Sequence, residues 1–344
     1  MSGYCGQFLR INLRTQTIQK EHLDIDRAKK FIGGRGLASY ILSREISPTV
    51  EPFSPENKII IATGPLTGTQ APASGRHMVV TKSPLTGTIA CSNSGGYWGA
   101  ELKKAGYDMV ILEEKSEKPC YICIQDDNVE IRDAETYWGK LVSETTEKLI
   151  KELGDSKARV MTIGPAGEKR SLLAAIMNDK YRAAGRSGVG AVMGSKNLKA
   201  IIVKGTGKIK PADEEAAKAA VQSARKKIKE HPVTSEGLPT YGTAVLVNII
   251  NESGIYPTNN FQKAYFETAD KASGEALAEQ YLVRNVACYG CPIACGRHSR
   301  LEDAEGEGPE YETLWAYSAN CGIDDLPAVI KANNWCNEYG LDTI

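Results

Sequence analysis

The sequence has no excess of charge of either sign, no long apolar run and no regular cysteine framework. Its 344 residues include 42 basic and 42 acidic side chains, so the formal net charge is +0. A chain without a basic surplus has no electrostatic preference for nucleic acid or for an anionic membrane surface. We therefore expect neither nucleic acid nor a membrane among its partners.

Long apolar segments are also missing. No stretch reaches the roughly 18 apolar residues that a membrane-spanning helix requires, and the opening MSGYCGQFLRINLRT lacks the apolar core of a signal peptide. A hydrophobic share of 42% and a charged share of 24% are typical of a globular protein. These features predict a cytoplasmic protein of two or three domains.

Nine cysteines are an odd number, and they are clustered, which favours metal or redox chemistry over disulfides. Cys288, Cys291 and Cys295 lie within the stretch CYGCPIACG (288–296). Thiolates are soft ligands, and four of them are the usual set for a [4Fe–4S] cluster. A zinc knuckle completed by His298 and a set of unligated thiols remain alternatives.

Two further pairs of cysteines bear on this site. Cys321 and Cys336 are other candidates for a fourth ligand within the chain. Cys120 and Cys123 also form a C-x-x-C pair, but their segment predicts a strand, in which residues three apart point to opposite faces. We therefore do not expect Cys120 and Cys123 to share a metal.

Four short runs rich in β-branched residues predict strands. They are residues 59–62, 78–80, 109–112 and 200–203. The segment TGKIKPAD (206–213) is a predicted linker, after which Asp213 caps a helix that Pro232 ends. From there the chain is mostly helices joined by loops, so the sequence predicts an α+β protein.

The turn sequence PLTGT occurs twice, at residues 65–69 and 84–88. Two similar turns suggest two related strand–turn units. Chance recurrence of Pro and Gly in turns is the alternative.

Three glycine-rich loops carry basic or amide side chains and occupy residues 74–77, 92–108 and 178–201. Glycine exposes backbone N–H groups, which bind phosphate oxygens together with forked guanidinium groups. The candidates for such forks are Arg76, Arg182 and Arg186, and Asn93 offers an amide oxygen to Mg²⁺. The Gly188–Gly194 pattern is a weak match to a dinucleotide-binding fingerprint, because its last spacing is one residue too long.

The chain resembles the tungsten-dependent aldehyde:ferredoxin oxidoreductase family along its whole length. The stretches that carry the resemblance include GGRGLASYIL, SPENKIIIATGPLTGT, VVTKSPLTGTIACSNSGGYWGAELKKAGYD, AAIMNDKYRAAGRSGVGAVMGSKNLKAI, YLVRNVACYGCPIACGR, EGPEYETLWA and GLDTI. The resemblance implies a bis-pterin tungsten cofactor beside one [4Fe–4S] cluster, with aldehydes as substrates and ferredoxin as electron acceptor.

The same resemblance implies the domain organisation. Residues 1–208 would form a pterin-binding base of two β-sheets with pseudo-twofold symmetry, which the two PLTGT turns would reflect. Residues 209–344 would form an incomplete, mostly helical domain with the cluster cysteines. In the family the fourth cluster cysteine comes from a C-terminal helical domain. We therefore expect this chain to be truncated, with that domain absent, and Cys321 and Cys336 to be ordinary buried helix residues.

Site residues follow from the matching motifs. Cys288, Cys291 and Cys295 would bind the cluster, Arg76 would lie between the cluster and a pterin, and Glu312 would be the carboxylate near tungsten. The remaining pterin contacts implied by the resemblance are Asn93, Gly95, Arg182, Ala183, Gly185, Leu341 and Asp342. Asn93 and the Ala183 carbonyl would also hold Mg²⁺ between the pterin phosphates.

The sequence departs from the family pattern in two respects. Asn337 stands where an Asp usually opens the second pterin motif. Lys331 and Asn334 stand where some members carry the Glu and His that bridge a homodimer through iron. A homodimer of this protein is therefore expected to lack the bridging iron.

The implied reaction oxidises an aldehyde with water to a carboxylic acid, with Glu312 as proton acceptor. An iron–sulfur electron carrier and an inactive scaffold subunit are the rival functions. Tungsten and pterin content separates the first rival from an enzyme, and aldehyde-dependent reduction of a dye separates the second.

Overall fold

The computed structural model describes residues 3–344. It divides into two compact units, each described here by itself. Unit 1 contains the residues up to Lys218 together with Asn337–Asp342, and unit 2 contains Ala219–Cys336 with Thr343–Ile344. The sequence predicts a domain boundary between residues 208 and 209, just before helix α7 (Glu214–Glu230), whereas the compact units divide inside that helix.

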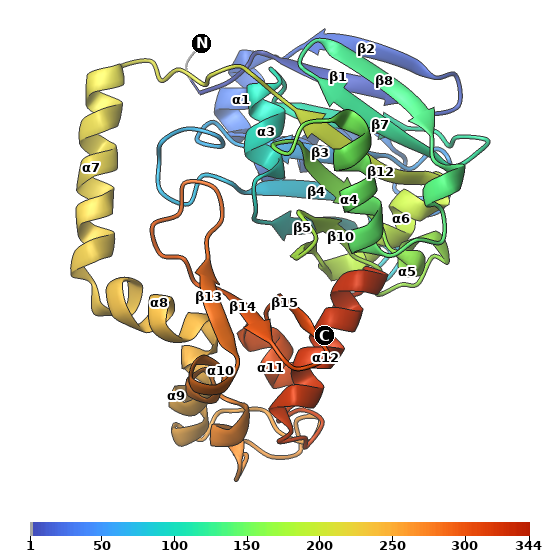
Figure 1. Ribbon diagram of the computed structural model, residues 1–344. Coiled ribbons are helices and arrows are strands. Elements are labelled where there is room, and N and C mark those ends of the chain that lie inside the picture. Colours follow the sequence, from blue (N-terminus) through green and yellow to red (C-terminus); the bar gives the residue numbers. More distant parts are fainter. Residues whose placement is uncertain (1–2) are drawn as a thin grey trace. The chain divides into compact units, whose positions relative to one another are not determined.

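Unit 1 is built on two six-stranded sheets (Figure 1). The first contains β1 (Gln7–Asn12), β2 (Thr17–His22), β3 (Ile59–Thr63), β4 (His77–Lys82), β5 (Ile89–Ser94) and β6 (Met109–Glu113). The second contains β7 (Cys120–Gln125), β8 (Asn128–Asp133), β9 (Arg159–Thr162), β10 (Ile176–Asn178), β11 (Arg182–Ala184) and β12 (Leu198–Lys204). All four strands predicted from the sequence are present, as β3, β4, β6 and β12.

The helices of unit 1 connect these strands. They are α1 (Ile25–Phe31), α2 (Gly34–Glu45), α3 (Trp98–Lys104), α4 (Val142–Leu153), α5 (Pro165–Glu168) and α6 (Val189–Ser195), with 3-10 turns at Glu135–Tyr137 and Arg186–Gly188. The predicted cap of α7 is also present, because the Asp213 carboxylate accepts a hydrogen bond from the Ala216 N–H at 2.9 Å.

The two sheets have the same topology. Their strand orders are β2-β1-β6-β3-β4-β5 and β8-β7-β12-β9-β10-β11, so each strand of the first sheet corresponds to the strand six later in the second. The single parallel pair of each sheet is also equivalent, β1 with β6 and β7 with β12. The strand orders and pairings confirm the predicted α+β class. They also confirm the base of two sheets with internal symmetry that the resemblance implies.

One turn fixes the alignment of the two halves. Gly64 and Pro65 follow β3, and Gly164 and Pro165 follow β9. The residue before each glycine donates its N–H to a carbonyl at the start of the neighbouring strand. Thr63 donates to Asp108, directly before β6, and Ile163 to Lys199, the second residue of β12. These matching bonds show that residues 63 and 163 are equivalent positions.

The PLTGT interpretation is wrong in one respect. Both copies of the sequence lie in the first half, residues 65–69 between β3 and β4 and residues 84–88 between β4 and β5. They are therefore consecutive turns of one sheet. The internal repeat instead pairs GPLTG with GPAGE, residues 64–68 with 164–168, a match too short to detect by sequence alone.

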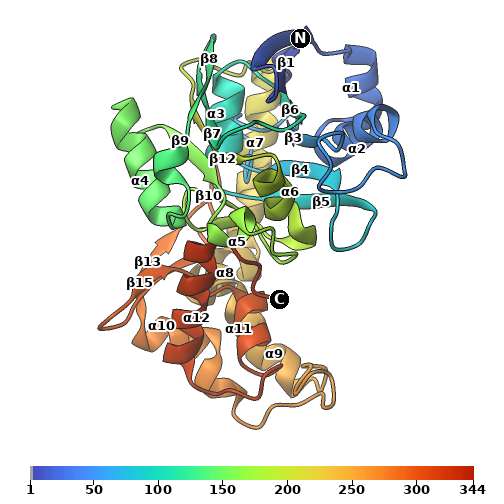
Figure 2. The same cartoon turned by 90° about the vertical axis from the view of Figure 1, so that its right-hand side faces the viewer.

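Alternation of apolar side chains along the strands produces three layers of core. Ile59 and Ile61 of β3 enter the central core between the two sheets, whereas Ile60 packs against α1 and α2 on the outer face. Figure 2 shows α2 and α4 on opposite sides of the paired sheets. In β7, Cys120 lies in the central core and Cys123 in the outer core beside α4, so the prediction that they point to opposite faces is confirmed.

Unit 2 combines helices with one small sheet. Its helices are α8 (Leu238–Tyr241), α9 (Leu246–Glu252), α10 (Gly274–Gln280), α11 (Tyr311–Tyr317) and α12 (Leu326–Tyr339), and α12 extends into unit 1. Short helical turns occupy Val233–Gly237, Gly242–Val245 and Ala269–Ala272. The sheet has the order β13 (Leu282–Val286), β14 (Gly296–Arg300) and β15 (Glu305–Glu307), all antiparallel. The predicted helical character is confirmed.

No helix within residues 3–344 has the length and apolar character needed to cross a membrane.

Replacing Gly194 by Ala tests the packing of α5 on α6. An added Cβ would lie 1.9 Å from the Gly167 carbonyl oxygen, so the two helices must separate. We expect a loss of about 3 kcal/mol in the free energy of unfolding, the upper end of overpacking costs. Urea denaturation measures it.

The control is Gly237→Ala, which also substitutes a helical glycine. Its Cβ would meet only a Val245 methyl group at 3.8 Å. We expect it to be neutral or slightly stabilising, since alanine restricts the unfolded chain. Equal effects of the two substitutions would contradict the close approach of α5 and α6.

Candidate functional site

The end strands of the two sheets, β5 and β11, lie against each other. A chain of hydrogen bonds joins them. The Ser94 hydroxyl donates to the Arg182 carbonyl at 3.1 Å, and the Asn178 amide donates both to the Ser94 oxygen at 2.8 Å and to the Arg182 carbonyl at 3.0 Å. The internal repeat thus brings two equivalent strands together at one place.

Predicted site residues occupy equivalent positions on these strands. In the first half, Ala62 pairs with Met78 and Met78 with Asn93. In the second half, the corresponding chain is Thr162, Met177 and Ala183. Asn93 and Ala183 are therefore equivalent, and two residues later so are Gly95 and Gly185. The equivalent strands β5 and β11 thus carry equivalent residues where they meet. Such an arrangement is expected at a site that binds two similar ligands.

Arg76 and Asn93 are in direct contact. Both side chains are exposed, and the guanidinium of Arg76 donates a short hydrogen bond to the Asn93 amide oxygen. The Asn93 amide nitrogen donates to the His77 carbonyl at 3.1 Å. The amide oxygen predicted to bind Mg²⁺ is thus occupied by a cation of the protein itself, and Mg²⁺ and Arg76 would compete for this atom.

Asp179 ties the two halves together beside this contact. Its carboxylate accepts a hydrogen bond from the Tyr97 N–H at 2.8 Å and lies 3.9 Å from the Arg159 guanidinium. The side chain is only 14% exposed, and burial raises the pKa of the Asp179 carboxyl, opposed by the Tyr97 N–H and Arg159. Gly96 packs directly on it, because an added Cβ would lie 2.8 Å from an Asp179 carboxylate oxygen.

The second-half glycine loop meets the segment at the end of α12. The Asp342 N–H donates to the Leu173 carbonyl at 2.9 Å, and Leu341 forms a bridge with Ala174. The Asp342 carboxylate lies 3.3 Å from the Arg186 guanidinium, and a Cβ on Gly185 would be 3.2 Å from it. Leu341, Asp342 and Gly185 are therefore gathered, as the sequence predicts for residues that contact one ligand.

His77 is a buried polar residue next to Arg76. Among the described residues, neither ring nitrogen of His77 has a hydrogen-bond partner, and neither does Oδ1 of Asn178. The ring packs on Trp98, with 5.2 Å between the ring centroids. Burial lowers the pKa of His77 to about 4, partly offset by the Asn178 amide and reinforced by the Arg76 charge. His77 is therefore neutral at physiological pH.

In unit 2, the three cysteines lie on the loop between β13 and β14. All three side chains are half-buried. The Cys291 N–H donates to the Cys288 carbonyl at 3.1 Å, and Gly290 between them has φ +65°, so the first two cysteines flank a tight turn.

The cysteine loop supplies three of the four thiolates that an iron–sulfur cluster takes. Across residues 3–344, no three His, Cys, Asp or Glu side chains are arranged to hold a metal ion. His298, the fourth ligand of the zinc alternative, instead pairs with Glu305 at 2.7 Å. The loop therefore offers three thiolates, and the fourth ligand of the zinc alternative is engaged by Glu305.

Cys321 and Cys336 differ from each other. Cys336 is buried in α12 and contacts the Tyr317 hydroxyl at 3.0 Å. Cys321 is exposed in the turn after α11, and its thiol contacts the Ala316 carbonyl at 3.2 Å. The expectation of two buried helix cysteines holds for Cys336 and is wrong for Cys321, because α11 ends at Tyr317.

Glu312 is exposed in the first turn of α11. The start of this helix is held by Thr243, whose hydroxyl accepts from the Tyr311 N–H at 3.0 Å and donates to Glu310 at 2.6 Å. The carboxylate of Glu312 is therefore exposed, and Thr243 holds the helix end that carries it.

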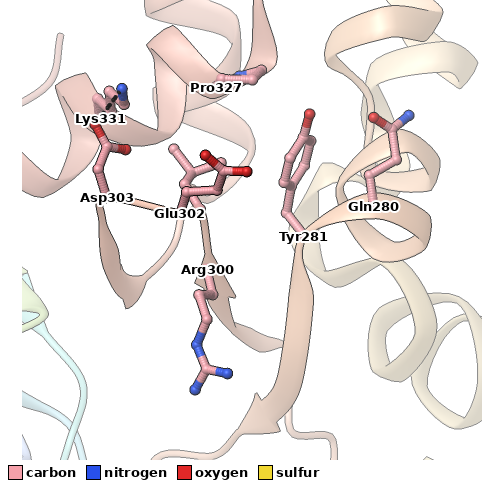
Figure 3. A pocket seen from close by; sticks show the side chains of 8 residues that line it. Gln280, Tyr281, Arg300, Glu302, Asp303, Pro327 and Lys331 are labelled. Carbon is pink, nitrogen blue, oxygen red and sulfur yellow. Dashed lines mark hydrogen bonds and ion pairs between the residues drawn. The ribbon is translucent and has the colours of Figure 1, made fainter.

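A surface hollow of about 550 Å³ lies elsewhere in unit 2 (Figure 3). Its lining includes Tyr281, Arg300 and Glu302, and Lys331 forms an ion pair with Asp303 at 2.7 Å. Lys331 is the position that the sequence resemblance assigns to a metal-bridging Glu in some relatives.

Sequence reasoning missed several residues that build the junction of unit 1. They are Ser94, His77, Asn178 and Asp179. All four lie at or directly beside the end of a strand, inside the three glycine-rich stretches. For Asn178 and Asp179, a polar residue at the end of an apolar strand was the available signal, whereas His77 opens β4 and Ser94 ends a half-polar strand.

Comparison with known proteins decides the family. The model of "Aldehyde ferredoxin oxidoreductase, N-terminal domain" matches residues 8–205, and that of "Aldehyde ferredoxin oxidoreductase, domains 2 & 3" matches residues 219–344. The chain belongs to the aldehyde ferredoxin oxidoreductase family. The predicted resemblance is confirmed.

Individual relatives in this family are similar along the whole chain. The tungsten-containing aldehyde ferredoxin oxidoreductases of Pyrococcus furiosus and Pyrococcus abyssi are 58% and 56% identical, over 100% of this chain. The chain spans 57% of the length of each of these relatives. The solved active site complex BamBC of benzoyl coenzyme A reductase has a TM-score of 0.89 and 32% identity, covering 99% of this chain and 54% of that chain.

The variant His77→Gln tests the neutral, buried imidazole. An unfolded histidine binds a proton below about pH 6.5, whereas folded His77 does so only below about 4. The unfolded state therefore holds more protons between these values, and stability is lost as the pH falls. We expect the free energy of unfolding of the unsubstituted chain to fall by about 2 kcal/mol more than that of the variant between pH 7 and pH 5.

Urea denaturation at the two pH values measures the difference. His22→Gln removes an exposed histidine and serves as the control. An unchanged pH dependence in His77→Gln would show that the ring is hydrated or charged in the folded state.

Proposed function

We propose that the chain forms part of a cytoplasmic tungsten enzyme that oxidises aldehydes and delivers the electrons to ferredoxin. The observation that carries this proposal is the pair of equivalent positions, Asn93 with Ala183 and Gly95 with Gly185, where β5 meets β11. Such a pair suits two like ligands, here two pterins that share one tungsten. The aldehyde substrate is favoured by the 58% identity to a relative named for it, against 32% for the structure named for benzoyl coenzyme A reductase.

The bound tungsten–pterin group would supply the electron-pair chemistry of RCHO + H2O → RCOOH + 2 H⁺ + 2 e⁻, with a [4Fe–4S] cluster as one-electron relay. Cys288, Cys291 and Cys295 would provide three thiolates of that cluster. Their half-buried position on one tight loop supports this role.

The basic residues of unit 1 would bind the pterin phosphates. Arg76, Arg182 and Arg186 each present a guanidinium, whose fork matches two phosphate oxygens. Gly95 and Gly185 would let the ligands approach the main chain closely. Leu341 and Asp342 would contact the pterin of the second half, since Asp342 lies against Gly185 and Arg186 and Leu341 pairs with Ala174.

Mg²⁺ between the phosphates would be held by Asn93 and the Ala183 carbonyl. For the Asn93 amide oxygen to take this role, Arg76 must first release it. A phosphate arriving beside Arg76 offers the guanidinium a stronger, charged partner than a neutral amide. Binding of the anion and release of the amide oxygen for the cation would thus be coupled.

Glu312 would accept the proton of the water that adds to the aldehyde carbonyl. It is exposed at the first turn of a helix whose start is fixed by Thr243. A carboxylate on an anchored helix end keeps its position while the substrate exchanges.

A homodimer of this protein would lack a bridging iron. Lys331 is cationic and already paired with Asp303 at 2.7 Å. An ammonium group is a donor without a lone pair and cannot bind iron.

Replacing Glu312 by Gln tests the proton acceptor. The amide has the same shape but accepts no proton at neutral pH, so we expect aldehyde turnover to fall at least about 100-fold. Tungsten and pterin contents of the purified enzyme should not change. Steady-state kinetics with a viologen dye and elemental analysis measure the two quantities.

Glu302→Gln is the matched control, because Glu302 is another exposed carboxylate of unit 2 and lines the surface hollow. It should leave turnover unchanged. Normal turnover in Glu312→Gln, with tungsten bound, would remove Glu312 from the reaction.

A further inference from the structure

Arg297 is a buried arginine two residues after the last cysteine of the loop. It lies on β14 and is 1% exposed, among the largest fully buried side chains of the chain. A buried guanidinium is costly unless its donors are satisfied. Its position next to Cys295 therefore calls for an explanation in terms of its partners.

The guanidinium of Arg297 joins α8 to the end of the cysteine loop. It donates to the carbonyl oxygens of Pro239 at 2.8 Å, Thr240 at 2.9 Å and Ala294 at 2.8 Å. Its Nε atom donates to the Gly296 carbonyl at 3.1 Å and, at 3.3 Å, to that of Cys295. A planar fork with five N–H donors is well suited to carbonyls from two segments, because several of its donors point in fixed directions.

The other end of the loop is tied to the same place. Asn285 on β13 is the register partner of Arg297 on β14, so these two residues close the base of the cysteine loop. The Asn285 amide donates to the Pro239 carbonyl at 2.7 Å, the same oxygen that Arg297 uses. One main-chain carbonyl of α8 therefore anchors both ends of the loop.

Gly242 lets α8 approach the loop this closely. It has φ +66°, and a Cβ added there would lie 2.9 Å from the Cys295 carbonyl oxygen and 3.2 Å from the Arg297 side chain. No larger residue fits between the end of α8 and the last cysteine. The contact is thus built into the backbone as well as into the side chains.

We propose that Arg297 is the positioning residue of the cysteine loop, and that its buried charge raises the reduction potential of the cluster held there. The proposal rests on the proposed function, because it assumes that Cys288, Cys291 and Cys295 bind an iron–sulfur cluster. A fixed loop base keeps the three thiolates in place when the cluster changes charge. A cation nearby stabilises the more negative, reduced cluster, since net charge around a cluster is one determinant of its potential.

Two substitutions separate anchoring from charge. Arg297→Lys keeps the positive charge but loses the fork, and Arg297→Gln loses both. In enzyme that carries its cluster, we expect the cluster to be lost to an iron chelator at least tenfold faster in both variants. An EPR-monitored redox titration should show a lower midpoint potential for Arg297→Gln and a value near the unsubstituted one for Arg297→Lys.

Arg300→Gln is the matched control. Arg300 lies on the same strand, but it is exposed and paired with Glu305 at 2.7 Å. Its loss removes the same charge without touching α8, and it should change neither the rate of cluster loss nor the potential. If Arg297→Gln behaves like Arg300→Gln in both measurements, the proposal is overturned.

A milder variant covers the case in which the Arg297 substitutions do not fold. Asn285→Ala removes only the second bond to the Pro239 carbonyl and should accelerate cluster loss about threefold, with an unchanged circular dichroism spectrum. An unchanged rate in this variant overturns the anchoring. If the unsubstituted enzyme contains no iron and no sulfide, the proposed function is overturned as well. If it contains both, but the variants keep the unsubstituted rate of cluster loss and midpoint potential, only the Arg297 proposal is overturned.

Discussion

The hydrogen bonds between β5 and β11 are the constraint on which the candidate site of unit 1 depends. Through Ser94, Asn178 and Arg182 they join the last strand of one sheet to the equivalent strand of the other. Because the two sheets share their strand order, joining equivalent strands places equivalent residues beside each other. The repeated fold thereby presents a pair of equivalent positions, which is the proposed binding surface, although no matching repeat is visible in the sequence.

Much of this architecture was predictable, because it is local. Strands β3, β4, β6 and β12 are runs of β-branched residues, and Asp213 is a standard helix cap, so pattern and propensity suffice for them. The internal repeat was not predictable from PLTGT, because the two copies are neighbouring turns of one sheet. Asn93 and Ala183 are equivalent because of the register of their strands. The sequence alone does not reveal this, because the two residues are of different types.

The candidate site shows the same division between local and distant information. The spacing of Cys288, Cys291 and Cys295 is local and indicated a metal group directly. Arg297 was passed over although it follows Cys295 by two residues, because an arginine is usually exposed. Its proposed role depends on the carbonyls of Pro239 and Thr240, more than fifty residues earlier in the chain. Likewise, no local pattern reveals that Arg76 occupies the Asn93 oxygen.

The ratio of pterin to tungsten in the purified enzyme tests the paired surface most directly. Two equivalent positions at one strand junction predict two pterins for each tungsten, together with about four iron atoms for the cysteine loop. A single pterin for each tungsten would show that the equivalence of the two halves has no role in binding. Zinc at the cysteines with no organic cofactor would contradict the whole account.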